Sequence, residues 1–114
     1  LAHVGIKAID PLGYIPFLRL MKSAQFILTD SGGIQEEATF LKKRCFTLRR
    51  NTERPSTIES GSNVLIDSEN PDDRSKVLAF ANNPSAIDVR IPPLWDGKAG
   101  ERIIAALRTF LQNR

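Results

Sequence analysis

Short apolar runs alternate with segments of helical periodicity along this chain. The runs that predict buried strands are Val4 to Ile9, Gln25 to Thr29, Arg44 to Leu48 and Asn63 to Ile66. The segments that predict helices are Tyr14 to Lys22, Ile34 to Lys42, residues 71–82 and Ala99 to Leu111, with one helical turn after Pro55. Short strands that alternate with helices favour an α/β fold with a parallel sheet of about four strands, flanked by helices.

Apolar spacing assigns an inward face to several of these helices. The residues predicted to point inward are Phe17, Leu18 and Met21 in the first helix, and Val77, Leu78 and Ala81 in the helix over residues 71–82. The last helix has the clearest apolar stripe, formed by Ile103, Ile104, Leu107, Phe110 and Leu111. Residues 83–97 carry three prolines and predict an extended loop.

Composition restricts the class of protein. Hydrophobic residues make up 41% and charged residues 25% of the 114 residues, which is typical of one globular domain and argues against a disordered chain. No apolar run approaches the roughly 18 residues of a membrane span. Because Cys45 is the single cysteine and His3 the single histidine, we expect neither a disulfide framework nor a metal site built from these residue types. The lack of a signal peptide predicts a cytoplasmic protein, and the missing initiator Met indicates a fragment.

The segment from Thr29 to Ala38 carries the most chemical information. A predicted strand ends at Thr29 and a predicted helix begins near Gly33, so the segment lies where parallel sheets bind ligands. Free N–H groups at the helix start, two glycines without Cβ atoms and the Ser31 hydroxyl would suit a phosphate. A capped turn, with Asp30 or Ser31 at the N-cap, is an equally good interpretation of the spacing alone.

Glu37 lies one turn into the same predicted helix. The apolar stripe of this helix runs through Ile34, Ala38 and Leu41, so the carboxylate is predicted on or beside it. Since an unpaired buried carboxylate is unfavourable, we expect it to have a partner. In a nucleotide site such a carboxylate accepts hydrogen bonds from ribose hydroxyls. The alternative is a boundary glutamate that reaches water and complements the helix dipole.

Basic residues gather after this helix, where six of the 16 in the chain fall within residues 42–54. The last of them, Arg54, precedes a proline that restricts its backbone, and its planar guanidinium suits phosphate oxygens or a carboxylate. The net charge of +3 indicates an anionic partner only weakly. A nucleic-acid surface is the rival interpretation, but the single aromatic residue there, Phe46, lies inside a predicted strand. Lys42 and Lys43 are expected on a solvated face.

Taken together, these segments closely resemble the UDP-N-acetylglucosamine 2-epimerases of the non-hydrolysing bacterial type. The matching motifs, in the family's order, are Ile9-Asp10-Pro11-Leu12, Tyr14-x-x-Phe17, Thr29 to Ala38 (TDSGGIQEEA), Thr52-Glu53-Arg54-Pro55 and Asp96 to Ile103. The resemblance covers nearly the whole chain. It implies that residues 1–114 are the C-terminal UDP-binding domain of a GT-B-type fold, Rossmann-like and incomplete at its N-terminal side, with the first domain of the enzyme absent.

The resemblance also implies roles for single residues. The loop that contacts the diphosphate corresponds to Ser31, Gly32 and Gly33. Glu37 corresponds to the ribose ligand, Phe17 to a contact near the uracil and Arg54 to a further ligand of the UDP-sugar. Departures from the family pattern are Leu12 for a polar residue, Thr39 for a proline, Ser56 for a glutamate and Leu94-Trp95 for a tyrosine–glycine pair.

The reaction implied by the resemblance is an isomerisation at C2 of the sugar. UDP is eliminated to give a 2-acetamidoglucal and is then added back with the opposite configuration. The family's acid–base carboxylates belong to the first domain, and a histidine comes from an earlier stretch of the second. We therefore expect no catalytic residue, metal or cofactor in this chain, which should be inactive alone. The implied partners are the UDP-sugar, the first domain and a second copy in a homodimer, without nucleic acid or membrane.

Two rival functions remain at this point. One is a hydrolysing epimerase that releases free N-acetylmannosamine, or another nucleotide-sugar enzyme of the GT-B type. The other is a basic module that binds RNA or another polyanion through residues 42–54.

Overall fold

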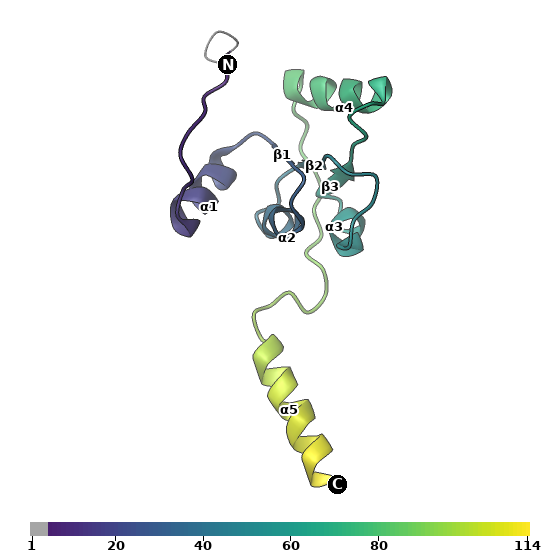
Figure 1. Cartoon of the computed structure of the whole chain (residues 1–114). Helices are drawn as coiled ribbons and strands as arrows, with labels where there is room; N and C mark the ends of the chain where they lie inside the picture. Colours follow the sequence, from purple (N-terminus) through teal and green to yellow (C-terminus); the bar gives the residue numbers. More distant parts are fainter. Residues whose placement is uncertain (1–4) are drawn as a thin grey trace.

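The computed structural model describes residues 5–114 and contains a small sheet with helices around it (Figure 1). The predictions for His3 and Val4 lie outside the described residues. In chain order the elements are α1 (Tyr14–Ser23), β1 (Ile27–Thr29), α2 (Gly32–Phe40), β2 (Cys45–Thr47), α3 (Pro55–Glu59), β3 (Asn63–Leu65), α4 (Pro71–Asn82) and α5 (Ala99–Gln112).

The sheet is parallel, with strand order β1-β2-β3, which confirms the predicted α/β class. In its register Ile27 lies beside Cys45, and Cys45 lies beside Asn63. At the other end Thr29 lies beside Thr47. All three carboxyl ends therefore meet at one edge, which is where the segments after β1 and β2 emerge.

Helices cover both faces of the sheet, with α2 and α3 on one side and α4 on the other (Figure 1). Successive strand residues point to opposite faces, and β2 follows this rule. Cys45 is fully buried in a cluster with Ala38 of α2. Phe46 instead packs edge-to-face against Phe80 of α4, with ring centroids 5.7 Å apart, and against Phe26 at the same distance.

Proline and asparagine residues define where two helices begin. Asn70 caps α4, because its side-chain oxygen accepts the N–H of Asp72 at 2.9 Å, and Pro71 occupies the first turn. Pro55 occupies the same position in α3, which confirms the predicted helical turn. α3 is thereby fixed directly after Arg54.

The strand predicted over residues 4–9 is wrong for the part that the structure describes. Residues 5–13 form neither helix nor strand, and Ile6 and Ile9 are each 53% exposed. A strand of a parallel sheet needs a neighbouring strand, and this segment pairs with none in residues 5–114. The described sheet therefore has three strands rather than about four.

The inward face predicted for α4 needs one correction. Leu78 is 63% exposed and faces away from the sheet. Phe80 takes the inward position instead, where it completes the aromatic cluster with Phe26 and Phe46. Phe80 also lies beneath the Arg44 guanidinium, which is 5.7 Å from the ring centroid. The contacts of this aromatic side chain, which is larger than that of Leu78, therefore set the orientation of α4 on the sheet.

α5 extends away from the sheet at the end of the long loop (Figure 1). The helix agrees with its prediction, but its apolar stripe is exposed. Ile103, Ile104, Leu107, Phe110 and Leu111 each keep 53–62% of their surface. An exposed apolar stripe of this length is typical of a surface that another part of a protein covers. None of the helices in the described part of the chain is long and apolar enough to cross a bilayer.

The Cys45 thiol is predicted to be unreactive in the folded chain. Its side chain is fully buried, and burial raises the pKa of the thiol above its ordinary value. We expect negligible reaction with a chromogenic disulfide reagent at about pH 8 in native buffer, and one reactive thiol after unfolding in guanidinium. Because the folded-state pKa is raised, this thiol favours folding below the unfolded-state pKa, and that contribution is lost as the pH rises through the folded-state value. Native and unfolded reaction rates that agree would contradict this assignment.

Candidate functional site

The N-terminus of α2 lies at the carboxyl edge of the sheet, directly after β1. Ser31 is the N-cap residue, but its side chain makes no capping hydrogen bond, so its hydroxyl is left for another partner. The Ser31 N–H donates to Thr29 Oγ1 at 3.1 Å, which holds the turn in place. The first N–H groups of a helix have no acceptor within the helix. This end of α2 therefore has the donors and the dipole of an anion site.

Arg54 lies against this helix start, as the shared sheet edge predicts. A Cβ atom built on Gly32 would be 3.9 Å from Arg54 Nε. The same Nε lies 3.3 Å from a Glu36 carboxylate oxygen, although its N–H is not aligned for a hydrogen bond. Both side chains are about two-fifths exposed, so this ion pair contributes little to stability. The guanidinium is therefore free to turn toward an anionic ligand.

The Glu53 carboxylate lies even closer to the same place. A side chain at Gly32 would collide with Glu53 Oε1. The other carboxylate oxygen pairs with Arg49 at 3.2 Å. A negative group beside the positive end of a helix is electrostatically favourable. The flexible, half-exposed Glu53 side chain thus occupies the space that the missing Cβ of Gly32 leaves, and a phosphate bound there would displace it.

Glu37 lines an apolar groove of about 360 Å³ between α1 and α2. The other residues of this groove are Tyr14, Leu18, Glu36, Phe40, Leu41 and Trp95. This location agrees with a carboxylate beside the apolar face of the helix. No ion pair to Glu37 occurs among residues 5–114, so the expected partner of this carboxylate stays a prediction. Glu37 is only half-buried, so its carboxylate stays in contact with water and needs no internal partner.

Phe17 does not line that groove. It packs against the buried cluster of Met21, Ile27, Ala38 and Cys45. The structure thus joins Gly32 and Arg54 at the start of α2, places Glu37 one turn further along and packs Phe17 into the core.

Two buried polar residues of α2 were missed by the sequence analysis. Gln35 and Thr39 are both fully buried and face β2, β3 and α3. The sequence feature that could have identified this buried pair is the spacing of four residues between Gln35 and Thr39. A polar pair at that spacing is more often found on a solvated helix face, so only the packing of α2 on the sheet distinguishes the two cases.

Several basic residues of the segment 42–54 have polar partners within the chain. Arg50 pairs with Asp67 at 2.9 Å, and Lys43, rather than being wholly solvated, donates to the Ala24 carbonyl at 2.9 Å. Arg44 donates to the Gly61 carbonyl at 3.0 Å. Arg49 and Arg54 have the carboxylate partners described above. Three of the six basic residues thus face a carboxylate of the same chain, which lowers the positive potential that a polyanion would meet.

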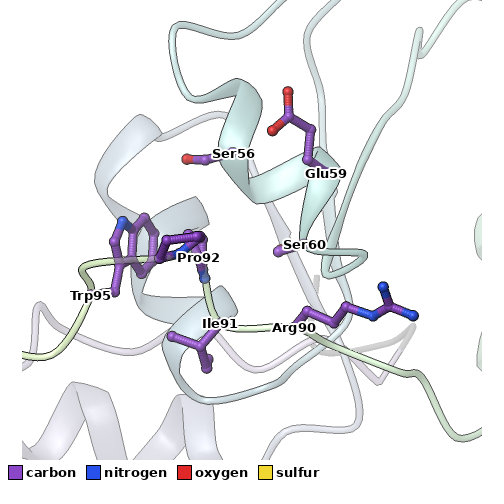
Figure 2. A pocket seen from close by; sticks show the side chains of 8 residues that line it. Ser56, Glu59, Ser60, Arg90, Ile91, Pro92 and Trp95 are labelled. Carbon is purple, nitrogen blue, oxygen red and sulfur yellow. The ribbon is translucent and has the colours of Figure 1, made fainter.

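A second cavity of about 330 Å³ lies between α3 and residues 90–95 (Figure 2). Arg90 N–H donates to the Ser60 carbonyl at 2.9 Å, which holds this segment against the end of α3. Gly61 allows the close approach, since its φ is +88° and a Cβ there would lie 2.8 Å from the Asp88 carbonyl oxygen. Trp95 lines this cavity and the groove of Glu37. Within residues 5–114 no group of three or more histidine, cysteine or acidic side chains could hold a metal ion.

Comparison with known proteins places the chain in one family. The family model for UDP-N-acetylglucosamine 2-epimerase matches residues 1–108. A UDP-N-acetylglucosamine 2-epimerase of Methanocaldococcus jannaschii is 45% identical over 109 residues, which is 90% of this chain and 27% of that protein. One from Escherichia coli K12 is 39% identical over 112 residues, which is 95% of this chain and 30% of that protein.

Solved structures give the same result. The M. jannaschii UDP-GlcNAc 2-epimerase in complex with UDP-GlcNAc and UDP matches with a TM-score of 0.73 and 46% identity, over 89% of this chain and 27% of that one. The enzyme from Neisseria meningitidis bound to UDP-GlcNAc matches with a TM-score of 0.75 and 34% identity, over 89% and 28%. The chain thus spans less than a third of the length of these relatives, and it belongs to the UDP-N-acetylglucosamine 2-epimerase family.

Proposed function

We propose that this chain is the UDP-binding portion of an enzyme that interconverts UDP-N-acetylglucosamine and UDP-N-acetylmannosamine. The observation that carries the proposal is the meeting of the α2 N-terminus with Arg54 at the carboxyl edge of the sheet. A diphosphate would find several donors here: the backbone N–H groups of Gly32 and Gly33, the Ser31 hydroxyl, which makes no capping bond, and the Arg54 guanidinium. The related M. jannaschii enzyme is solved with UDP-GlcNAc and UDP bound.

The nucleoside end of UDP is assigned to the side of α2 that carries Glu37. A half-buried carboxylate beside an apolar groove can accept hydrogen bonds from two ribose hydroxyls, which replace the water that it contacts in the free chain. Phe17 near the uracil rests on the family resemblance alone, since its side chain packs against the core.

In the proposed reaction these residues hold the leaving group. The C1–O bond breaks as C2 loses its proton, and UDP leaves with the bonding electrons. The helix N–H groups and Arg54 stabilise the charge that develops on the diphosphate. Re-addition of UDP at C1, with a proton returned to the opposite face of C2, completes the epimerisation.

The proton-transfer groups are assigned to the part of the relatives that this chain does not match. The chain is then the C-terminal domain, incomplete at its N-terminal side, and inactive alone. Two exposed surfaces support a missing first domain as its partner, namely residues 5–13 without a neighbouring strand and the apolar stripe of α5. A homodimer of the whole enzyme and a cytoplasmic location remain predictions from the sequence.

The test is an NMR titration of the isotope-labelled chain with UDP. We expect amide shifts at Ser31, Gly32 and Gly33, and no turnover of UDP-GlcNAc. Activity is measured in a chimera in which this chain replaces the matching part of the M. jannaschii relative. UDP-ManNAc as product supports the proposal, whereas free N-acetylmannosamine plus UDP supports the hydrolysing alternative. Absence of UDP shifts, or RNA binding that excess UDP does not displace, would refute the proposal.

A further inference from the structure

A cluster of buried polar side chains lies between α2, α3 and the sheet. Its members are at most 5% exposed: Gln35, Thr39, Thr47, Thr57, Ser60, Ser62 and Asn63. Burial of polar groups is unfavourable unless they form hydrogen bonds with one another, so the bonds of this cluster should be specific. None of these residues belongs to the donor set proposed for the diphosphate, but one branch of the cluster reaches the backbone of Arg54 through hydrogen bonds.

Gln35 is the centre of that branch. Its Oε1 accepts hydrogen bonds from Thr52 Oγ1 at 2.7 Å and from Asn63 Nδ2 at 3.0 Å. Thr47 Oγ1 donates to Asn63 Oδ1 at 2.6 Å, so the amide of Asn63 is oriented with its Nδ2 toward Gln35. These contacts also fix the amide of Gln35, because a flipped orientation would oppose two NH₂ groups.

Two threonine hydroxyls connect these buried amides to the backbone of Arg54 by hydrogen bonds. Thr52 Oγ1 donates to Gln35 and accepts the Arg54 N–H at 3.0 Å. Thr57 Oγ1 accepts from Asn63 Nδ2 at 3.0 Å and donates to the Arg54 carbonyl at 2.7 Å. The N–H and C=O of Arg54 are therefore both held by hydroxyls that are bonded to the same pair of buried amides.

The Gln35 amide is buried although its set of hydrogen bonds is incomplete. Its Nε2 is buried and has no acceptor in the part of the chain that the structure describes. An unpaired buried donor is unfavourable for folding. The contacts that Gln35 does make all lead toward the Arg54 backbone or the sheet, which points to a role in placing the Arg54 loop.

We propose that Gln35 and Thr52 are positioning residues of the UDP site, which set the Arg54 backbone so that its guanidinium lies against the α2 N-terminus. This inference rests on the proposed function. This hydrogen-bond network links the two halves of the anion site, the α2 N-terminus and Arg54, because Gln35 belongs to the helix whose N-terminus would receive the diphosphate. A small displacement of Arg54 would weaken a charged hydrogen bond to the ligand without disturbing the helix donors.

The experiment compares Thr52→Val, which removes the hydroxyl, with Thr52→Ser, which keeps it. In NMR titrations of the chain, UDP should bind about tenfold more weakly to Thr52→Val, and Thr52→Ser should restore near wild-type affinity. The matched control is Thr39→Val, the same change at a buried hydroxyl whose bonds lead to Ser62 and the Gln35 carbonyl rather than to Arg54. This control should lower the unfolding temperature but leave the UDP Kd unchanged.

A double-mutant cycle separates positioning from a general effect on the fold. In an Arg54→Ala background, Thr52→Val should cause no further loss of UDP affinity, because its effect passes through Arg54. Equal losses in both backgrounds, or an unchanged Kd in Thr52→Val, would overturn this inference while wild-type binding keeps the proposed function intact. Absence of wild-type UDP binding would refute the proposed function and the inference with it.

Discussion

Glu37→Gln is expected to weaken UDP binding by about tenfold to a hundredfold, the largest effect on affinity of any substitution in the proposed site. In the proposed complex the carboxylate accepts two charge-assisted hydrogen bonds from ribose hydroxyls. Glutamine has nearly the same shape but presents one neutral acceptor, and its NH₂ group faces a hydroxyl that needs an acceptor. Because Glu37 is half-buried in an apolar groove, water compensates only in part. The Kd is measured by NMR titration of the chain with UDP.

Glu59→Gln is the matched control for this change. Glu59 is an exposed carboxylate of α3 that lines the second cavity rather than the α2 groove. The same loss of one negative charge there should leave the UDP Kd unchanged. Equal effects of the two variants would mean that net charge, not a ribose contact, governs affinity, and wild-type affinity in Glu37→Gln would remove Glu37 from the site.

Phe46→Ala should reduce the free energy of unfolding by about 3–5 kcal/mol, which is a large part of the stability of an ordinary domain. Phe46 is 3% exposed and contacts Phe26 and Phe80 edge-to-face at 5.7 Å. Its removal leaves a cavity between the sheet and α4 that the surrounding rings can fill only in part. Urea unfolding followed by circular dichroism measures the change.

Phe40→Ala provides the comparison for the core substitution. Phe40 is 65% exposed at the end of α2, so the same truncation removes little buried surface. We expect a change within about 0.5 kcal/mol. If both variants lose the same stability, the aromatic cluster is not the contact that holds α4 to the sheet.

Helices and strands could be predicted from the sequence wherever the local pattern of apolar residues agrees with the final packing. Ile27, Cys45 and Phe46 lie in short apolar runs that became strands of a parallel sheet. The segment over residues 5–9 has a similar apolar content, but a strand exists only when a neighbour supplies its hydrogen bonds. Leu78 and Phe80 are both apolar residues of α4, and the sequence does not show which of them packs against the ring of Phe46.

The sequence by itself determined the class of the fold, the motif at the start of α2 and the family, because backbone propensity, glycine spacing and motif order are local properties. Only the tertiary structure decided which polar groups became buried. Gln35, Thr39 and Asn63 look like surface residues in the sequence, yet they are at most 2% exposed once α2 lies across β2 and β3. Their hydrogen bonds join segments up to 28 residues apart, and such contacts form only when the strands have set the distance between α2 and the Arg54 loop.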